Sequence, residues 1–265
     1  MEQDDGLYYE CARDIIISLI AGYSAAQRAV EHGDPPDAQA AGRHTLQRLY
    51  YLAALHDLDQ ADQAEVIDVI RTHGPTIREL RTQTGGRSLS KPAEFPLNAV
   101  ERAAIFDQKI LPEIVIGTRE SNPRAIIVGG AAGSGKSSTI RRLRNDRAGA
   151  AGVMIDPDLL AAYHPADWDL IWTGETRTQD AVVEDARSWA MMALDYAIGL
   201  QADIFLETAI SSVAAINDYA TLLGDEGYRV DVHMAVVAEP VRKLHLLLRT
   251  QCRQGNWEVL FPSGT

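Results

Sequence analysis

A glycine-rich stretch in the middle of the chain has the residue types and spacing of a phosphate-binding loop. The residues from Gly130 to Ser137 fit the pattern G-x-x-x-x-G-K-[ST] at every fixed position. A strand-like run, RAIIV, precedes them and a helix-like run, SSTIRRLRND, follows, which is the context in which this motif binds nucleotide phosphates. In such a loop the backbone N–H groups turn toward the phosphates, and the start of the helix adds partial positive charge. The predicted nucleotide site comprises Gly130, Ala131, Ala132, Gly133, Ser134, Gly135, Lys136, Ser137 and Ser138.

Two residues of this loop carry specific chemistry. Lys136 can place its ammonium group against the β- and γ-phosphates, and the Ser137 hydroxyl can ligate Mg²⁺. The motif fits ATP or GTP, and it does not identify the group that receives the terminal phosphate. That group could be water, a protein or a small molecule.

Two carboxylates follow the next strand-like run, GVMID. Asp156 and Asp158 stand at its carboxyl end, where ligands bind in open α/β sheets. Transfer of a phosphoryl group to a hydroxyl needs a carboxylate that accepts the hydroxyl proton. The alternative is that Asp-Pro-Asp only caps the following helix. One aspartate can cap the helix while the other reacts.

The elements that must position these residues alternate along the second part of the chain. Short apolar runs at residues 125–130, 152–156, 202–207 and 230–238 are separated by helical segments, and a further helix is expected just after Leu97. Such alternation is typical of an α/β domain with a mostly parallel sheet and flanking helices. With the phosphate loop after the first strand, a P-loop kinase-type fold is the prediction.

The first part of the chain predicts a small all-α bundle. Apolar residues recur at helical spacing over residues 1–81 and indicate three helices. Gly33 could end the first helix and Asp34-Pro35 could begin the second, while the third would be interrupted or ended near Gly74-Pro75. The predicted domains are therefore a three-helix bundle (1–85), a Gly/Ser/Pro-rich linker (86–96) and a P-loop domain (97–265).

The charge balance restricts the partners. The chain of 265 residues carries a formal charge of −12, and residues 1–85 hold 14 acidic against 7 basic side chains. Such a surface repels nucleic acid and anionic membranes, so neither is expected as a partner. Two cysteines without metal or disulfide spacing, and an acidic start without a signal peptide, favour a cytoplasmic location.

Several ordered segments together resemble the zeta toxin family of bacterial toxin–antitoxin systems. The resemblance rests on LNAVERAAIFDQKILPEIVIGTRESNPRAIIVGGAAGSGKSS, on IDPDLLAAYHP, which is similar to the family's I-D-x-D-x-(variable)-H-P segment, and on ADIFLETA. It implies an enzyme that uses ATP to phosphorylate UDP-N-acetylglucosamine and thereby blocks the synthesis of cell-wall precursors. It also implies roles for single residues. Asp158 would be the base, and the residues near the acceptor would be Glu207, Thr208, Asp156 and His164.

Two departures from the family pattern concern the acceptor and the arginines. Met191 stands where the family has a glutamate that holds the sugar nucleotide, and Ala209 changes the family's Glu-Gly-Thr. The family places two arginines near the γ-phosphate. The resemblance carries these roles to Arg249 and Arg253, while Arg242 fits less well because it lies at the start of the last long helix.

Two other functions remain open from the sequence. A kinase of another small hydroxyl compound, such as a dinucleotide or an antibiotic, would use the same loop and aspartate. A catalytically silent nucleotide-binding regulator would need neither an acceptor nor the arginine pair. In zeta systems the antitoxin is a small three-helix protein that blocks the nucleotide site. The resemblance therefore suggests that residues 1–85 are an antitoxin-like domain, which acts on its own chain or on a neighbouring one.

Overall fold

The computed structural model describes residues 2–84, 96–114, 117–146, 152–209 and 213–261. The chain forms two compact units, and each is assembled from segments that are distant in sequence. The first unit, here called the helical unit, contains Met1–Asn98, Ala161–Asp185 and Leu247–Thr265. The second, here called the sheet unit, contains Ala99–Leu160 and Ala186–Leu246.

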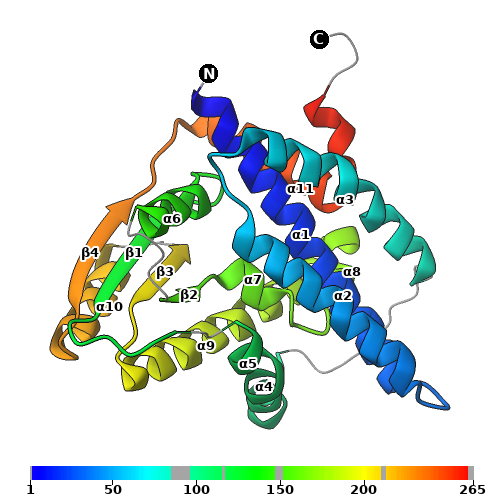
Figure 1. The fold of residues 1–265 in the computed structure, drawn as a ribbon, viewed down its shortest axis with the longest axis horizontal. Coiled ribbons are helices and arrows are strands. Elements are labelled where there is room, and N and C mark those ends of the chain that lie inside the picture. The colour runs from blue at the N-terminus through cyan, green and yellow to red at the C-terminus, as the bar shows by residue number, and fades with distance from the viewer. Residues whose placement is uncertain (1, 85–95, 115–116, 147–151, 210–212, 262–265) are drawn as a thin grey trace. The chain divides into compact units, whose positions relative to one another are not determined.

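Three long helices at the start of the chain form the framework of the helical unit. They are α1 (Glu2–Glu31), α2 (Ala38–Asp57) and α3 (Gln63–Gln83). Both α2 and α3 pack along α1, as Figure 1 shows. Helix α1 is the centre of the unit because Ala12, Ile15, Leu19 and Ile20 are completely buried. The predicted three-helix bundle is thus confirmed.

Two details of the bundle differ from the prediction. Helix α2 begins at Ala38, not at Asp34-Pro35, because the side chain of Asp37 accepts a hydrogen bond from the Ala40 N–H and caps the helix. Helix α3 continues through Pro75 to Gln83. Gly74 there is buried, and a Cβ on it would lie 2.3 Å from the Trp257 ring. The predicted linker falls mainly on residues 85–95, which lie outside the described residues.

The remaining elements of the helical unit come from later parts of the chain. They are α8 (Asp167–Thr173), which contacts α1, and the 3₁₀ turn η2 (Trp257–Leu260), which contacts α3. Two long helices run through both units, namely α9 (Thr176–Leu200) and α11 (Glu239–Arg253). No helix in the described segments is long and apolar enough to cross a membrane.

A parallel sheet of four strands organises the sheet unit. Its strands, visible in Figure 1, are β1 (Arg124–Gly130), β2 (Val153–Ile155), β3 (Ile204–Ala209) and β4 (Arg229–Met234). The order is β2-β3-β1-β4, and each of these strands is parallel to the neighbours with which it pairs. The four apolar runs read from the sequence therefore form strands of one parallel sheet, as predicted.

Helices cover the sheet and complete its core. The helices and turns of this unit are α4 (Ala99–Ile105), the π-helical turn η1 (Phe106–Ile110), α5 (Leu111–Glu113), α6 (Lys136–Asn145), α7 (Pro157–Ala161) and α10 (Val213–Asp225). Helix α6 packs on β1 and β3, and α10 packs on β4 and β1. Ile126, Val128 and Phe205 meet Ile140 of α6 in a buried cluster. This packing fixes the start of α6, and therefore the phosphate loop, against the end of β1.

Candidate functional site

The phosphate loop joins the end of β1 at Gly130 to the start of α6 at Lys136. Two of its glycines are required by the backbone. Gly133 and Gly135 have φ angles of 77° and 81°, a region that side chains with a Cβ rarely adopt. A Cβ on Gly133 would also lie 2.9 Å from the Arg242 carbonyl oxygen. The loop thus bends back on itself while α11 packs closely against it.

Lys136 is the cation of this loop, and it is almost fully buried. Its ammonium group donates to the Ala131 carbonyl oxygen at 3.3 Å and lies 3.8 Å from Glu207 Oε1. Ser137 and Ser138 follow it in the first turn of α6, and both are also buried. A charged lysine held at the start of a helix is the arrangement that binds the terminal phosphates of a nucleotide.

The strand register brings three carboxylates to the same edge of the sheet. Ile155, the last residue of β2, pairs with Leu206, so Asp156 follows beside Glu207 of β3. Glu207 in turn pairs with Val128 of β1, close to the start of the phosphate loop. Because parallel strands end at the same edge, their carboxyl ends form the region where ligands bind in such sheets.

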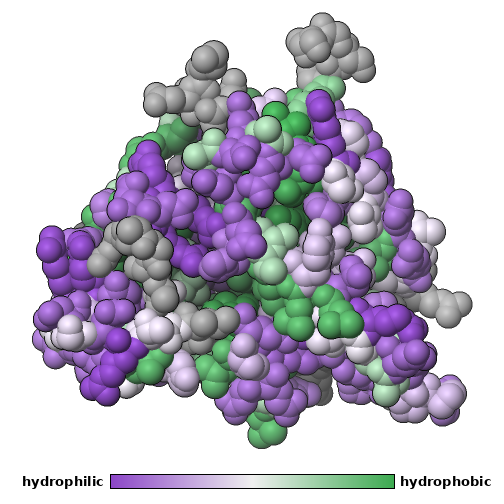
Figure 2. Space-filling view, viewed as in Figure 1, coloured by the Kyte–Doolittle hydropathy of each residue, from purple (hydrophilic) through white to green (hydrophobic). Residues whose placement is uncertain are grey.

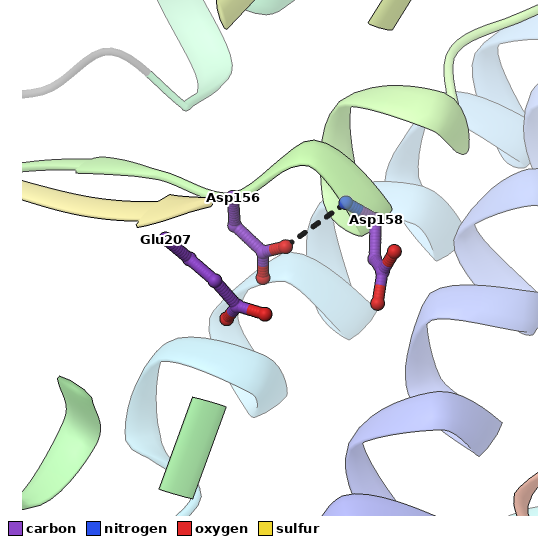
Figure 3. Close-up of side chains that lie close together, drawn as sticks. All are labelled: Asp156, Asp158 and Glu207. Atoms are coloured by element: carbon purple, nitrogen blue, oxygen red, sulfur yellow. Dashed lines mark hydrogen bonds between the residues drawn. The ribbon is translucent and has the colours of Figure 1, made fainter. Parts of the chain in front are cut away.

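The two aspartates have different environments. Asp156 is buried, and its Oδ1 accepts hydrogen bonds from the Asp158 N–H at 3.0 Å and the Leu159 N–H at 3.4 Å. It therefore caps α7. Asp158 is exposed to solvent, as expected for a carboxylate that can reach an incoming hydroxyl. Figure 3 shows the two aspartates with Glu207 alongside.

The three carboxylates form one acidic cluster. Oxygen atoms of Asp156, Asp158 and Glu207 lie within 4.8 Å of one another. Mg²⁺ prefers oxygen ligands, so these carboxylates and the Ser137 hydroxyl are of the right chemical type to hold this ion. With Lys136 beside Glu207, the sheet unit brings together side chains of the chemical types that can bind phosphate, hold a metal ion and accept a proton. Thr208, the next predicted acceptor residue, pairs with Gly129 at the same strand ends.

His164 has a different setting from the other predicted acceptor residues. It belongs to the helical unit, and its side chain is completely buried. Nδ1 accepts from the Ala166 N–H at 3.0 Å, so the proton of the neutral ring is on Nε2, 3.2 Å from Asp185 Oδ2. Burial lowers the pKa of His164 to about 4. The imidazole therefore links the start of α8 to α9 in this structure.

Arg249, expected near the γ-phosphate, lies in the helical unit and contacts two acidic residues of α1. Its Nε and Nη2 donate to the two Asp14 carboxylate oxygens at 2.6 and 2.9 Å. Its Nη1 lies 3.6 Å from Glu10 Oε2. The guanidinium is 15% exposed and both carboxylates are 5% exposed, so this is a largely buried ion pair.

The other two arginines of α11 have different partners. Arg253 Nη2 lies 3.8 Å from Asp167 Oδ2 in the helical unit. Arg242 donates from Nη1 to the Ala132 carbonyl oxygen at 3.4 Å, so it contacts the phosphate loop itself. The sequence favoured Arg242 less because it lies at the start of α11. That position alone does not reveal which loop packs there.

Sequence reasoning did not identify Asp14 and Glu10 as partners of an arginine. The available signal was the excess of acidic residues in residues 1–85. It indicated a surface that attracts cations, but it could not indicate which acidic residue meets which cation.

Comparisons with known proteins bear on the family and on the fold. A family model described as zeta toxin matches residues 111–255, which is more than half of the chain. A solved structure from a study of the PezAT chromosomal toxin–antitoxin system of Streptococcus pneumoniae is similar, with a TM-score of 0.52 and 19% identity. The match covers 63% of this chain and 67% of that one, and at this identity it supports the fold alone. No curated protein matches the chain.

Proposed function

The chain belongs to the zeta toxin family of kinase-like toxins, and from that membership we propose that it transfers the γ-phosphate of ATP to a hydroxyl of UDP-N-acetylglucosamine. The observation that carries the proposal is the position of Lys136, 3.8 Å from Glu207 and therefore beside the acidic cluster of Asp156 and Asp158. A cation that can bind phosphate and a carboxylate that can accept a proton thus lie together in the sheet unit. Phosphorylation of this sugar nucleotide would block the synthesis of cell-wall precursors.

Asp158 is the base in the proposed reaction. It accepts the proton of the acceptor hydroxyl while the hydroxyl oxygen bonds to the γ-phosphorus. The bond between that phosphorus and the β,γ-bridging oxygen breaks, and ADP leaves. Lys136 and the N–H groups of the loop offset the negative charge on the phosphates. Asp156 holds the start of α7, and with it the backbone of Asp158, in position.

The site would also hold Mg²⁺. Ser137 and the acidic cluster are the residues that would bind it, and a bound ion would neutralise part of the phosphate charge. Without such a cation, three carboxylates this close to the γ-phosphate would repel it.

The side chain at position 191 bears on the identity of the acceptor. Met191 is 37% exposed on α9, and the Tyr219 hydroxyl donates to its sulfur at 3.5 Å. An apolar side chain here makes poorer contacts to a sugar hydroxyl than a glutamate would, so a different hydroxyl compound such as a dinucleotide or an antibiotic is the second candidate.

We further propose that the N-terminal helices inhibit the kinase. Asp14 and Glu10 of α1 contact Arg249, the arginine proposed for the γ-phosphate, as two carboxylates in place of a phosphate. An arginine held in this way is not available to neutralise charge in the transition state, an effect worth several kcal/mol. Helix α1 would therefore act as an antitoxin-like segment, in its own chain or in a neighbouring one.

The test measures ADP release and transfer of labelled phosphate from ATP, with and without UDP-N-acetylglucosamine, in the presence of Mg²⁺. Phosphate transfer that depends on this acceptor, and that falls at least about 100-fold in Lys136→Ala, supports the proposal. Phosphate transfer to a different compound in a panel of acceptors would change the identity of the proposed acceptor, but it would still support the kinase activity. Tight ATP binding with no transfer to any acceptor, even in a chain with Asp14 and Glu10 neutralised, would favour a silent regulator.

A further inference from the structure

The two cysteines of the chain stand close together although they lie near its opposite ends in sequence. Cys11 is on α1 and Cys252 is on α11, both are completely buried, and neither is in a disulfide. Glu10 and Asp14, on either side of Cys11, both contact Arg249, which lies one turn before Cys252, so the two thiols lie near each other. The Cys252 side chain is close enough to raise the pKa of the Cys11 thiol through a hydrogen bond. Two neighbouring thiols on facing helices can be joined by a disulfide, whose S–S bond is about 2.05 Å long.

The ion pair next to the thiols fixes how the two helices face each other. Asp14 lies three residues after Cys11, and Arg249 lies three residues before Cys252. Residues three apart share one face of a helix. Because Asp14 contacts Arg249 while Cys11 contacts Cys252, the two segments run in opposite directions with the thiols one helical turn from the ion pair.

We propose that Cys11 and Cys252 form a redox-sensitive modification site, at which a hydroperoxide joins them in a disulfide that keeps α1 on α11. The covalent part needs only the two thiols. Its regulatory consequence rests on the proposed function, because the disulfide would hold Arg249 against Asp14 and so hold the kinase in its inhibited state.

Oxidation begins when α1 moves away from α11. In the closed contact the Cys252 hydrogen bond and burial raise the pKa of Cys11 well above its ordinary range, and a thiol without its thiolate reacts slowly. Separation exposes one cysteine, whose thiolate attacks a peroxide oxygen. The products are a sulfenic acid and, after protonation, water.

Return of α1 to α11 completes the reaction. The second thiol attacks the sulfenic sulfur, the S–S bond forms, and a second water leaves. In sum, two thiols and one hydrogen peroxide give one disulfide and two waters. A dithiol reductant reverses the step by thiol–disulfide exchange. The disulfide would therefore form only after α1 has separated from α11 and returned. It would then keep the two helices from separating again.

The experiment uses the full chain treated with hydrogen peroxide, then with a thiol-blocking reagent under denaturing conditions. Peptide mapping should find Cys11 joined to Cys252, and the oxidised chain should run faster on a non-reducing gel because the bond closes a very long loop. ADP release should fall at least about tenfold on oxidation and return after reduction, since a cross-link across a long loop strongly favours the closed contact. The controls Cys11→Ala and Cys252→Ala should show equal release before and after peroxide.

Each outcome decides one part of the inference. Full blocking of both thiols after peroxide treatment overturns the modification site, whatever the kinase does. A disulfide that leaves both ADP release and the thermal unfolding midpoint unchanged overturns the inference that the bond keeps α1 on α11. The disulfide could also raise the unfolding midpoint while neither the reduced nor the oxidised chain transfers phosphate to any acceptor. That result supports the cysteine pair and counts against the proposed function.

Discussion

Arg249 of α11 forms a two-point ion pair with Asp14 of α1, at 2.6 and 2.9 Å, in a largely buried contact. The fork of a guanidinium matches two carboxylate oxygens as well as it matches two phosphate oxygens. The guanidinium proposed to serve the γ-phosphate is thus already bound to an anionic group that offers it two oxygen atoms, as a phosphate would. The same helix reaches the phosphate loop through Arg242, which lies two turns earlier on α11.

Removing the charge of Asp14 should activate the kinase. In Asp14→Asn with Glu10→Gln, ADP release should rise at least about tenfold, because loss of one partner of a buried ion pair weakens a contact by several kcal/mol. The thermal unfolding midpoint should fall as the release rises. Asp68→Asn, an exposed change on α3, is the matched control and should alter neither quantity. Equal release from the double variant and the parent chain would contradict inhibition through Arg249.

Substitutions of the two aspartates after β2 should affect different quantities, one the rate of phosphate transfer and the other the stability. Asp158→Asn should reduce phosphate transfer by about 100-fold or more, since a proposed base is lost, and should leave the unfolding free energy nearly unchanged because the side chain is exposed. Asp156→Ala should lower the free energy of unfolding by about 1 kcal/mol, because it removes the cap of α7. Kinetics and urea unfolding on both variants measure the difference. An unchanged rate of phosphate transfer in Asp158→Asn would show that another residue is the base.

The stability of the chain should fall in mild acid because of His164. Its pKa is lowered from 6.5 to about 4, mainly by burial and also by the nearby Arg28, although Asp185 opposes the shift. Between these two values the unfolded chain binds a proton that the folded chain does not, so the free energy of unfolding decreases as the pH falls. His164 should account for about 2 kcal/mol between pH 7 and pH 5.

Urea unfolding at both pH values, on the parent chain and on His164→Gln, isolates this contribution. Burial also lowers the pKa of His44 and His73, so part of the slope remains in the variant. The difference between the two slopes belongs to His164. Identical slopes would show that the imidazole does not stay neutral in the folded chain.

Gly74 should tolerate no larger residue. A Cβ there would lie 2.3 Å from Trp257, so Gly74→Ala must push η2 away from α3 and should lower the free energy of unfolding by about 1 to 3 kcal/mol. Gly42→Ala is the matched control. A Cβ at Gly42 meets nothing within 4 Å, and alanine in an open helix position should raise stability by up to about 1 kcal/mol. A destabilised Gly42→Ala would show that the packing around α2 is tighter than this structure has it.

Local signals in the sequence were strong enough to predict most of the sheet unit. Residues 124–145 carry a strand, a loop motif and a helix start in direct succession, so β1, the phosphate loop and α6 follow from short-range chemistry. Apolar runs likewise predicted the other three strands. The boundaries inside the bundle did not follow from local signals, because the cap at Asp37 competed with Asp34-Pro35. In addition, a proline within a helix is accommodated only when packing such as that around Gly74 supports the helix.

The sequence alone determined that a nucleotide-binding loop is followed by a pair of aspartates at the end of the next strand, since both depend on neighbours along the chain. Only the tertiary structure decided which aspartate caps α7, that Lys136 lies beside Glu207, and that Asp14 meets Arg249 while Cys11 meets Cys252. These contacts join residues that are distant in the chain. Their formation depends on strand register and helix packing, which no single segment encodes by itself.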